Sequence, residues 1–158
     1  MRCVVQRVTR SSVSVDGTTL SGIGKGLNVL CGVEKDDGAD DCEYIARKLL
    51  DLRIFDDSEG KSNLSITDLS AAGEDVGILL ISQFTLMGDA RHGKRPSYSD
   101  AMDHAAAESF FERFASDIEA RCAARGIGFG TGRFGGDMKV SIENDGPFTI
   151  LLDSKKTF

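Results

Sequence analysis

The segment Thr131–Thr149 reads TGRFGGDMKVSIENDGPFT and places a glycine–proline pair between two strand patterns. Apolar and polar residues alternate from Met138 to Glu143, which predicts a half-buried strand. A second strand is predicted for Phe148–Leu152, so Asn144–Pro147 is consistent with a turn between them. One of the chain's two prolines stands here beside a glycine, so we expect a rigid backbone edge without side chains. We interpret this edge as part of the functional site.

Valine-rich strands separated by turns dominate the N-terminal part of the chain. Met1–Val15 is followed by Asp16-Gly17, a dipeptide that favours a tight hairpin turn, and then by a second strand at Thr18–Ile23. Leu27–Val33 is a third strand pattern. Hairpins of this kind predict antiparallel pairing.

Two helices and one buried strand complete the predicted architecture. Apolar residues at helical spacing occur over Cys42–Leu50 and again over Ala107–Cys122, and Gly126 is a helix-ending glycine. Val76–Phe84 is apolar without alternation, which predicts a strand covered on both faces. We therefore expect one α+β domain over residues 1–158, with a mostly antiparallel sheet curled toward a barrel and two main helices.

Composition excludes several classes of protein. The net charge of −6 weighs against a general nucleic-acid binder. The four cysteines form no CxxC pair and have no neighbouring histidine, so we expect reduced thiols and no metal. The longest apolar run is too short to cross a membrane, and MRCVVQRV lacks the features of a signal peptide. We expect a cytoplasmic protein without a cofactor.

Familiar catalytic motifs are missing from the sequence. There is no HExxH, GxSxG or Walker sequence. Gly130–Gly135 matches GxGxxG, but a helix pattern precedes it and a strand pattern follows, the reverse of a dinucleotide site. The two histidines, His92 and His104, lie in or near a polar segment and are expected to be solvated. A nucleophile triad or a metal enzyme is therefore not predicted.

Two features could carry chemistry or could be structural. Ser82–Leu86, SQFTL, stands where the buried strand ends, a position in which a sheet holds polar groups rigidly. The same residues could simply cap backbone groups. Arg7 lies on an apolar strand face and needs partners there, either as a structural anchor or as an anchor for a site.

SQFTL together with NDGPFT at Asn144–Thr149 resembles the D-aminoacyl-tRNA deacylase family, of the D-tyrosyl-tRNA deacylase type. Further segments fall in the family's order, namely MRCVVQRVTRSSVSVDG, LRIFDDSEGKSNLSITD, GKRPSYSDA and TGRFGGDMKVSIENDGP. The resemblance covers essentially the whole chain. It implies that family's fold and a homodimer that hydrolyses the ester between a D-amino acid and tRNA, and also acts on glycine mischarged on tRNA-Ala.

The resemblance also implies roles for particular residues. In the family the Gly-Pro bond is cis and reaches into the partner subunit's pocket, where it excludes L-amino acids. This role falls on Gly146 and Pro147, with Phe148 and Thr149 beside them and Arg7 as a brace. Phe148 stands where the family usually has valine, which alters the packing beside the selector.

The catalytic pocket of the family corresponds to Ser82, Gln83, Phe84 and Thr85. The expected mechanism is substrate-assisted, with the tRNA 2′-hydroxyl orienting water and backbone N–H groups stabilising the oxyanion. Two alternatives stay open. One is an esterase with Thr85 as nucleophile, which would need an adjacent base. The other is a non-catalytic RNA-binding module of the same fold.

A basic cluster precedes the long helix. We expect Arg91, Lys94 and Arg95 to contact phosphates at the acceptor end of the aminoacyl-tRNA, although scattered solvated charges are an equally good interpretation.

Overall fold

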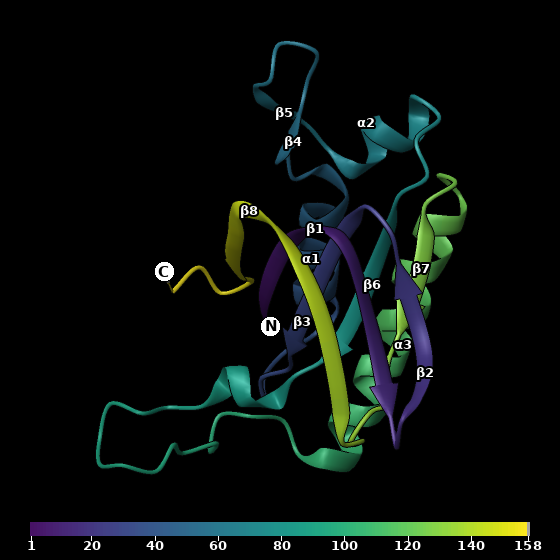
Figure 1. The fold of residues 1–158 in the computed structure, drawn as a ribbon. Coiled ribbons are helices and arrows are strands. Elements are labelled where there is room, and N and C mark those ends of the chain that lie inside the picture. The colour runs from purple at the N-terminus through teal and green to yellow at the C-terminus, as the bar shows by residue number, and fades with distance from the viewer. Residues whose placement is uncertain (158) are drawn as a thin grey trace.

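The computed structural model describes residues 1–157. Figure 1 shows how these residues are arranged. In chain order the elements are β1 (Arg2–Val15), β2 (Thr18–Ile23), β3 (Gly26–Gly32), α1 (Ala39–Asp51), β4 (Phe55–Asp56), β5 (Ser62–Leu64), α2 (Ile66–Ala71), β6 (Gly77–Ser82), the 3₁₀ helix η1 (Phe84–Met87), α3 (His104–Ala123), β7 (Gly128–Thr131) and β8 (Met138–Asp153).

The main sheet is mostly antiparallel, as expected, but it also contains parallel ladders. Its strand order is β2-β1-β3-β6-β7, and β8 also pairs with β1. β1 runs antiparallel to β2, β3 and β8, whereas the β3–β6 and β6–β7 ladders are parallel. The parallel pairs arise because helices connect these strands, and a helical crossover returns the chain in the same direction.

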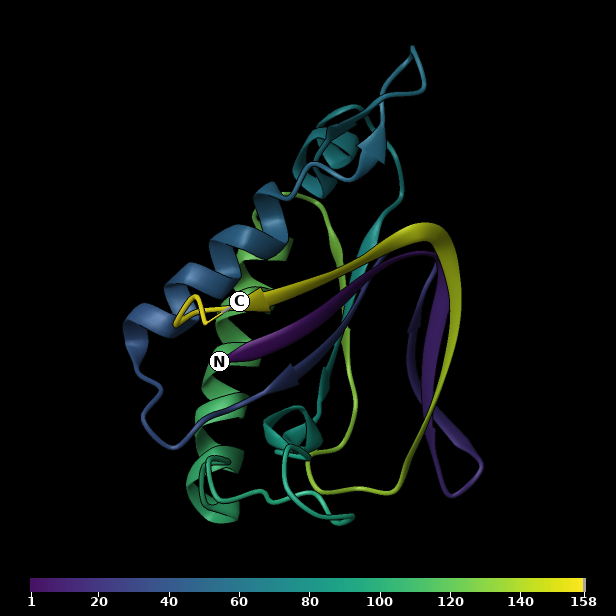
Figure 2. The same ribbon diagram turned by 90° about the vertical axis from the view of Figure 1, so that its left-hand side faces the viewer.

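The predicted curl toward a barrel is confirmed. β1 and β8 are long strands that bend together, so that their two halves belong to two facing parts of the sheet (Figure 2). A hydrogen bond from Ser21 Oγ to the Thr131 carbonyl oxygen (2.7 Å) links β2 to β7 on the far side of the curl.

Both predicted helices are present and cover one face of the sheet (Figure 2). The main core joins α1 and α3 to the strands, with Leu49 and Phe114 buried against Val5 and Leu80. The third helix, α2, is short and is capped at its N-terminus by Ser65, whose side chain accepts a hydrogen bond from the Asp68 amide.

A smaller cluster of Val13, Leu79 and Ile81 fills the inside of the curl. β6 is thus covered on both faces, as its unbroken apolar sequence predicted.

The predicted turn at Asn144–Pro147 is wrong. β8 runs without a break from Met138 to Asp153 and pairs with β1 on both sides of this segment. Asn144 is opposite Val8 and Thr149 is opposite Gln6. The residues of β8 between them are therefore extra residues opposite Arg7, and the register shifts at this point. The long strand β1 supplies partners to both halves, which is why a bulge replaces a hairpin.

All four cysteines are free. Cys3 and Cys31 are opposite each other on β1 and β3 and are buried. The side-chain hydrogen bond with Cys3, together with burial, raises the pKa of Cys31 well above its ordinary value. This thiol therefore stays protonated near neutral pH.

Among residues 1–157, no helix combines the length and the apolar character needed to cross a membrane.

Candidate functional site

A cavity of about 510 Å³ lies where the end of β6, η1, the start of α3 and the β7–β8 connection meet. Its size is ordinary for a small-molecule site. It combines an apolar floor with a few polar side chains and two aromatic rings. The lining residues are Ile81, Ser82, Gln83, Phe84, Met102, His104, Ala107, Phe134, Gly135, Gly136, Asp137, Met138 and Val140.

Three of the four predicted pocket residues line this cavity because a buried strand delivers them there. β6 is buried from Gly77 to Ile81, and Ser82 is its last residue. The Gln83 amide then donates to the Cys31 carbonyl oxygen (2.7 Å) before the chain turns into η1. The sheet thus fixes the backbone at the cavity mouth.

The first turn of η1 presents backbone donors. Its first hydrogen bond runs from the Leu86 amide to the Gln83 carbonyl oxygen (3.2 Å). The amides of Phe84 and Thr85 come before this bond and have no acceptor within the turn. Such N–H groups can stabilise negative charge that develops on an ester oxygen.

Thr85 is placed differently from its three predecessors. It is exposed, is not among the lining residues, and its hydroxyl accepts a hydrogen bond from the Gln83 side-chain amide. An amide cannot remove a proton, so this contact does not activate the hydroxyl. Phe84 is 58% exposed and packs edge-on against Tyr98 of the following loop, with ring centroids 5.1 Å apart.

The cavity also contains residues that sequence reasoning missed. His104 is the first residue of α3, and its ring lies edge-on to Phe134 at 5.3 Å. Phe134 in turn packs against Phe111 of α3 at 5.9 Å. His104 is exposed, as expected, but its place at the cavity was not predicted, and Phe134 belongs to the glycine-rich stretch that was interpreted as a turn. The sequence does not indicate this contact, because about 30 residues of chain separate the two side chains.

Arg7 is the centre of a second region, opposite the irregularity in β8. Its side chain is 7% exposed, and its guanidinium donates to the carbonyl oxygens of Ile54 (2.8 Å) and Asp145 (3.1 Å). It also pairs with the carboxylates of Asp145 (3.0 Å) and Asp56 (3.3 Å). The Phe148 ring lies 4.3 Å from the guanidinium carbon. The predicted need of Arg7 for partners is met by four residues.

The Gly146–Pro147 peptide bond between these contacts is cis. Both residues are exposed, as is Thr149, which accepts a hydrogen bond from Gln6 (3.3 Å). The Asn144 side-chain amide secures the segment by donating to the Arg7 carbonyl oxygen (2.9 Å) and the Phe148 carbonyl oxygen (3.2 Å).

The cavity and the Asp145–Phe148 segment lie apart. None of the four residues of this segment lines the cavity. Arg7 ties the segment to the chain beside β4, whereas η1 lies at the opposite end of the sheet, and Figures 1 and 2 agree on this placement. The structure of one chain does not bring the two predicted parts of the site together.

The basic cluster projects on the long loop between η1 and α3 (Figure 1). Arg91 forms a pair of hydrogen bonds with the Asp89 carboxylate, which lower the pKa of Asp89 to about 2. Lys94 and Arg95 are exposed, and within the described part of the chain they form no ion pair. These two side chains are the more available cations.

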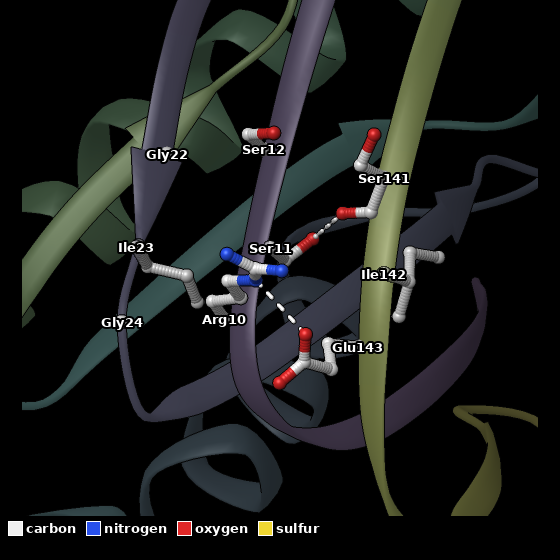
Figure 3. A pocket seen from close by; sticks show the side chains of 9 residues that line it. All are labelled: Arg10, Ser11, Ser12, Gly22, Ile23, Gly24, Ser141, Ile142 and Glu143. Carbon is white, nitrogen blue, oxygen red and sulfur yellow. Dashed lines mark hydrogen bonds and ion pairs between the residues drawn. The ribbon is translucent and has the colours of Figure 1, made fainter.

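Another hollow, of about 640 Å³, lies on the outer side of β1, β2 and β8 (Figure 3). Its charged side chains neutralise each other, since Arg10 Nε lies 2.9 Å from Glu143 Oε2. Ser11 donates to the Ser141 carbonyl oxygen (2.9 Å). With these groups already paired, the hollow offers less chemistry than the cavity at Ser82.

No group of three or more potential metal-binding side chains gathers within residues 1–157.

Comparison with known proteins decides the family. Residues 4–153 match the model of the family described as D-Tyr-tRNA(Tyr) deacylase. The chain belongs to this family. The resemblance read from SQFTL and NDGPFT is thereby confirmed.

Curated relatives match over their whole length. The chain is 51% identical to the D-aminoacyl-tRNA deacylase of Fervidobacterium nodosum over 158 residues, which is 100% of both chains. It is also 51% identical to the D-aminoacyl-tRNA deacylase of Thermoanaerobacter sp. strain X514, again with 100% of both covered.

Two solved structures share the fold. The one titled c-Myc DNA Unwinding Element Binding Protein has 39% identity and a TM-score of 0.86, with 97% of this chain and 98% of that chain covered. A probable eukaryotic D-amino acid tRNA deacylase has 18% identity and a TM-score of 0.76, with coverage of 96% and 97%, and this likeness supports the fold alone.

Proposed function

We propose that this protein hydrolyses the ester bond of D-aminoacyl-tRNA and releases a free D-amino acid and tRNA. The observation that carries the proposal is the cavity lined by Ser82, Gln83 and Phe84 in a chain that belongs to the D-Tyr-tRNA(Tyr) deacylase family. Glycine mischarged on tRNA-Ala is a second expected substrate, because glycine has no side chain for a chiral filter to reject.

The proposed catalysis relies on the backbone and on the substrate. An aminoacyl ester is activated by its α-ammonium group and by the neighbouring 2′-hydroxyl of the ribose. The Phe84 and Thr85 amides, which have no acceptor within η1, would hold the oxyanion. The 2′-hydroxyl would orient the attacking water. This scheme needs no catalytic triad.

Thr85 ranks second as a nucleophile. Its hydroxyl is held by the Gln83 amide and it does not line the cavity. A threonine nucleophile requires a base beside it, and the amide is not one.

Chiral selection is assigned to Gly146 and Pro147, with Phe148 and Thr149 beside them and Arg7 as the brace. A backbone edge at the chiral centre can reject one enantiomer and still accept many side chains. Within one chain this edge lies away from the cavity, so the proposal requires a second copy whose segment enters the cavity. Phe84 and Leu151, each 58% exposed, are apolar surface that such a homodimer would cover.

Binding of the acceptor end is assigned to the loop that follows η1. Lys94 and Arg95 are the better phosphate contacts, since Arg91 is already paired with Asp89. Reversing the charge of Arg95 should weaken tRNA binding at low salt. Unchanged affinity would show that the loop is not part of the tRNA-binding surface.

The decisive experiment incubates the protein with D-tyrosyl-tRNA and L-tyrosyl-tRNA and follows release of tyrosine. We expect release from the D form and protection of the L form. A protein that releases neither is not a deacylase.

One alternative has a specific observation in its favour. The relative titled c-Myc DNA Unwinding Element Binding Protein has the same fold at 39% identity, which keeps a non-catalytic nucleic-acid-binding module open. The net charge of −6 weighs against it. Salt-dependent RNA binding without any release of D-tyrosine would favour this alternative.

A further inference from the structure

His104 is the imidazole of the cavity, and the proposed chemistry does not use it. The chain has two histidines. Both are exposed: His92 lies in the loop that carries the basic cluster, and His104 begins α3 and lines the cavity together with Ser82 and Gln83.

The His104 ring has neighbours on two sides. Phe134 contacts it edge-on, with centroids 5.3 Å apart and an interplanar angle of 74°. Gly135 passes close to the other part of the ring, since a Cβ at this residue would lie 3.0 Å from His104 Nε2. Gly135 has a φ of 67°, which is the left-handed region that favours glycine. The connection between β7 and β8 is thus shaped around the imidazole.

The imidazole is exposed and keeps its hydrogen-bonding capacity. Within residues 1–157, neither ring nitrogen forms a hydrogen bond or an ion pair. Gln83 differs, because its amide already donates to Thr85. A neutral imidazole has one donor and one acceptor nitrogen. His104 therefore offers a ligand two unused polar positions on a positioned ring.

The chemistry of the cavity indicates which part of a substrate reaches His104. If the η1 amides hold the ester, as proposed above, the group attached to the ester oxygen is the ribose of the terminal nucleoside. That nucleoside must occupy the rest of the cavity, where Met102, Phe134 and Val140 supply apolar surface. Asp137 also lies there, and its carboxylate repels a phosphate but accepts hydrogen bonds from a base or a ribose.

We propose that His104 binds the terminal adenosine of the acceptor end through a hydrogen bond from its imidazole, and so positions the ester against the η1 amides. This inference rests on the proposed deacylase function. His104 acts on binding of the nucleoside and takes no part in proton transfer to the ester.

Steady-state kinetics with D-tyrosyl-tRNA test the proposal. His104→Ala should raise KM about five- to tenfold, the effect of one lost hydrogen bond, with kcat nearly unchanged. His104→Gln, which retains a polar group, should recover part of the loss, and His104→Phe, which retains only the ring, should not. His92→Ala is the matched control and should behave as the wild type. A large fall in kcat at constant KM, or full recovery by phenylalanine, would overturn the proposal.

A binding measurement separates this inference from the proposed function. In the His92→Ala protein, His104 is the single imidazole, so its ¹⁵N NMR signals are assigned without ambiguity. Adding adenosine 5′-monophosphate should shift these signals, and cytidine 5′-monophosphate should shift them less. Equal shifts or none would refute the role of His104, even if the protein hydrolyses D-tyrosyl-tRNA. Shifts with adenosine in a protein that hydrolyses nothing would instead refute the deacylase.

Discussion

The cavity beside η1 and the segment Asp145–Phe148 are built in opposite ways. The cavity is concave, and polar groups such as the His104 imidazole and the first amides of η1 have no hydrogen-bond partner among residues 1–157. Gly146 and Pro147 in the segment are exposed, yet Arg7 and Asn144 contact the segment on both sides. The first region is equipped to receive a ligand, and the second to present a fixed backbone.

This difference supports the proposal that the two regions belong to one site. A surface that discriminates by shape needs a rigid backbone. Arg7 contacts Asp145 and Phe148 of the segment and ties them to Ile54 and Asp56. A surface that stabilises a transition state needs donors that are not already used. Each region lacks what the other has, which is the relation expected of two halves contributed by two copies.

Removing the brace should have the largest effect. Arg7→Ala deletes the buried guanidinium and its bonds to Ile54 and Asp145, and we expect a loss of about 3 kcal/mol in the free energy of unfolding. Urea unfolding measures it. The matched control is Arg10→Ala on the same strand, whose side chain is 77% exposed and which should cost less than about 0.5 kcal/mol. Equal losses for both variants would mean that Arg7 holds nothing in place.

The segment Asp145–Phe148 can be altered at Gly146 without unfolding the protein. A Cβ at Gly146 would have Asn144 Oδ1 as its nearest neighbour at 3.8 Å, so Gly146→Ala should change stability by less than about 0.5 kcal/mol. If the segment enters a partner's cavity, the same methyl group should lower the rate of D-tyrosyl-tRNA hydrolysis about tenfold or more. A variant that is both stable and fully active would show that the segment is not part of the site.

Gly135→Ala makes the corresponding change in the cavity and should behave differently. The added Cβ would lie 3.0 Å from His104 Nε2 at a backbone φ of 67°, so we expect a loss of about 1 kcal/mol in stability. The displaced imidazole should raise KM about threefold. Thermal unfolding and kinetics check both, and a neutral result would show that the β7–β8 connection does not position His104.

Thr85→Ala should have the smallest effect. Because the hydroxyl only accepts a hydrogen bond from Gln83 at the cavity edge, we expect kcat to stay within about threefold of the wild type. Loss of activity by several orders of magnitude in single-turnover assays would restore Thr85 as the nucleophile.

Local sequence patterns predicted the elements that depend on local physics. The Asp16-Gly17 turn, the apolar strand before Ser82 and the stripe on α3 followed from turn chemistry and periodicity. The turn predicted at Asn144–Pro147 was wrong because the partner strand β1 lies more than a hundred residues earlier in the chain. The parallel pairing of β3 with β6 was hidden for the same reason.

The site was only partly visible in the sequence. Ser82–Phe84 were predicted from their place at the end of a buried strand and from family resemblance, and they line the cavity. β7 was missed because its glycines carry no periodic signal. His104 was missed because its neighbours Phe134 and Gly135 come from a distant connection, and contacts of that kind leave no pattern around the histidine itself.

Subunit complementation tests most directly whether the two regions form one site across two copies. Ser82→Tyr should fill the cavity, and Gly146→Phe should obstruct the exposed segment, so that each homodimer is inactive on D-tyrosyl-tRNA. In a mixture that exchanges subunits freely, each heterodimer has one intact cavity facing one intact segment, and activity should return to about one quarter of the wild-type value. Heterodimers that form but remain as inactive as their parents would contradict a site shared between subunits.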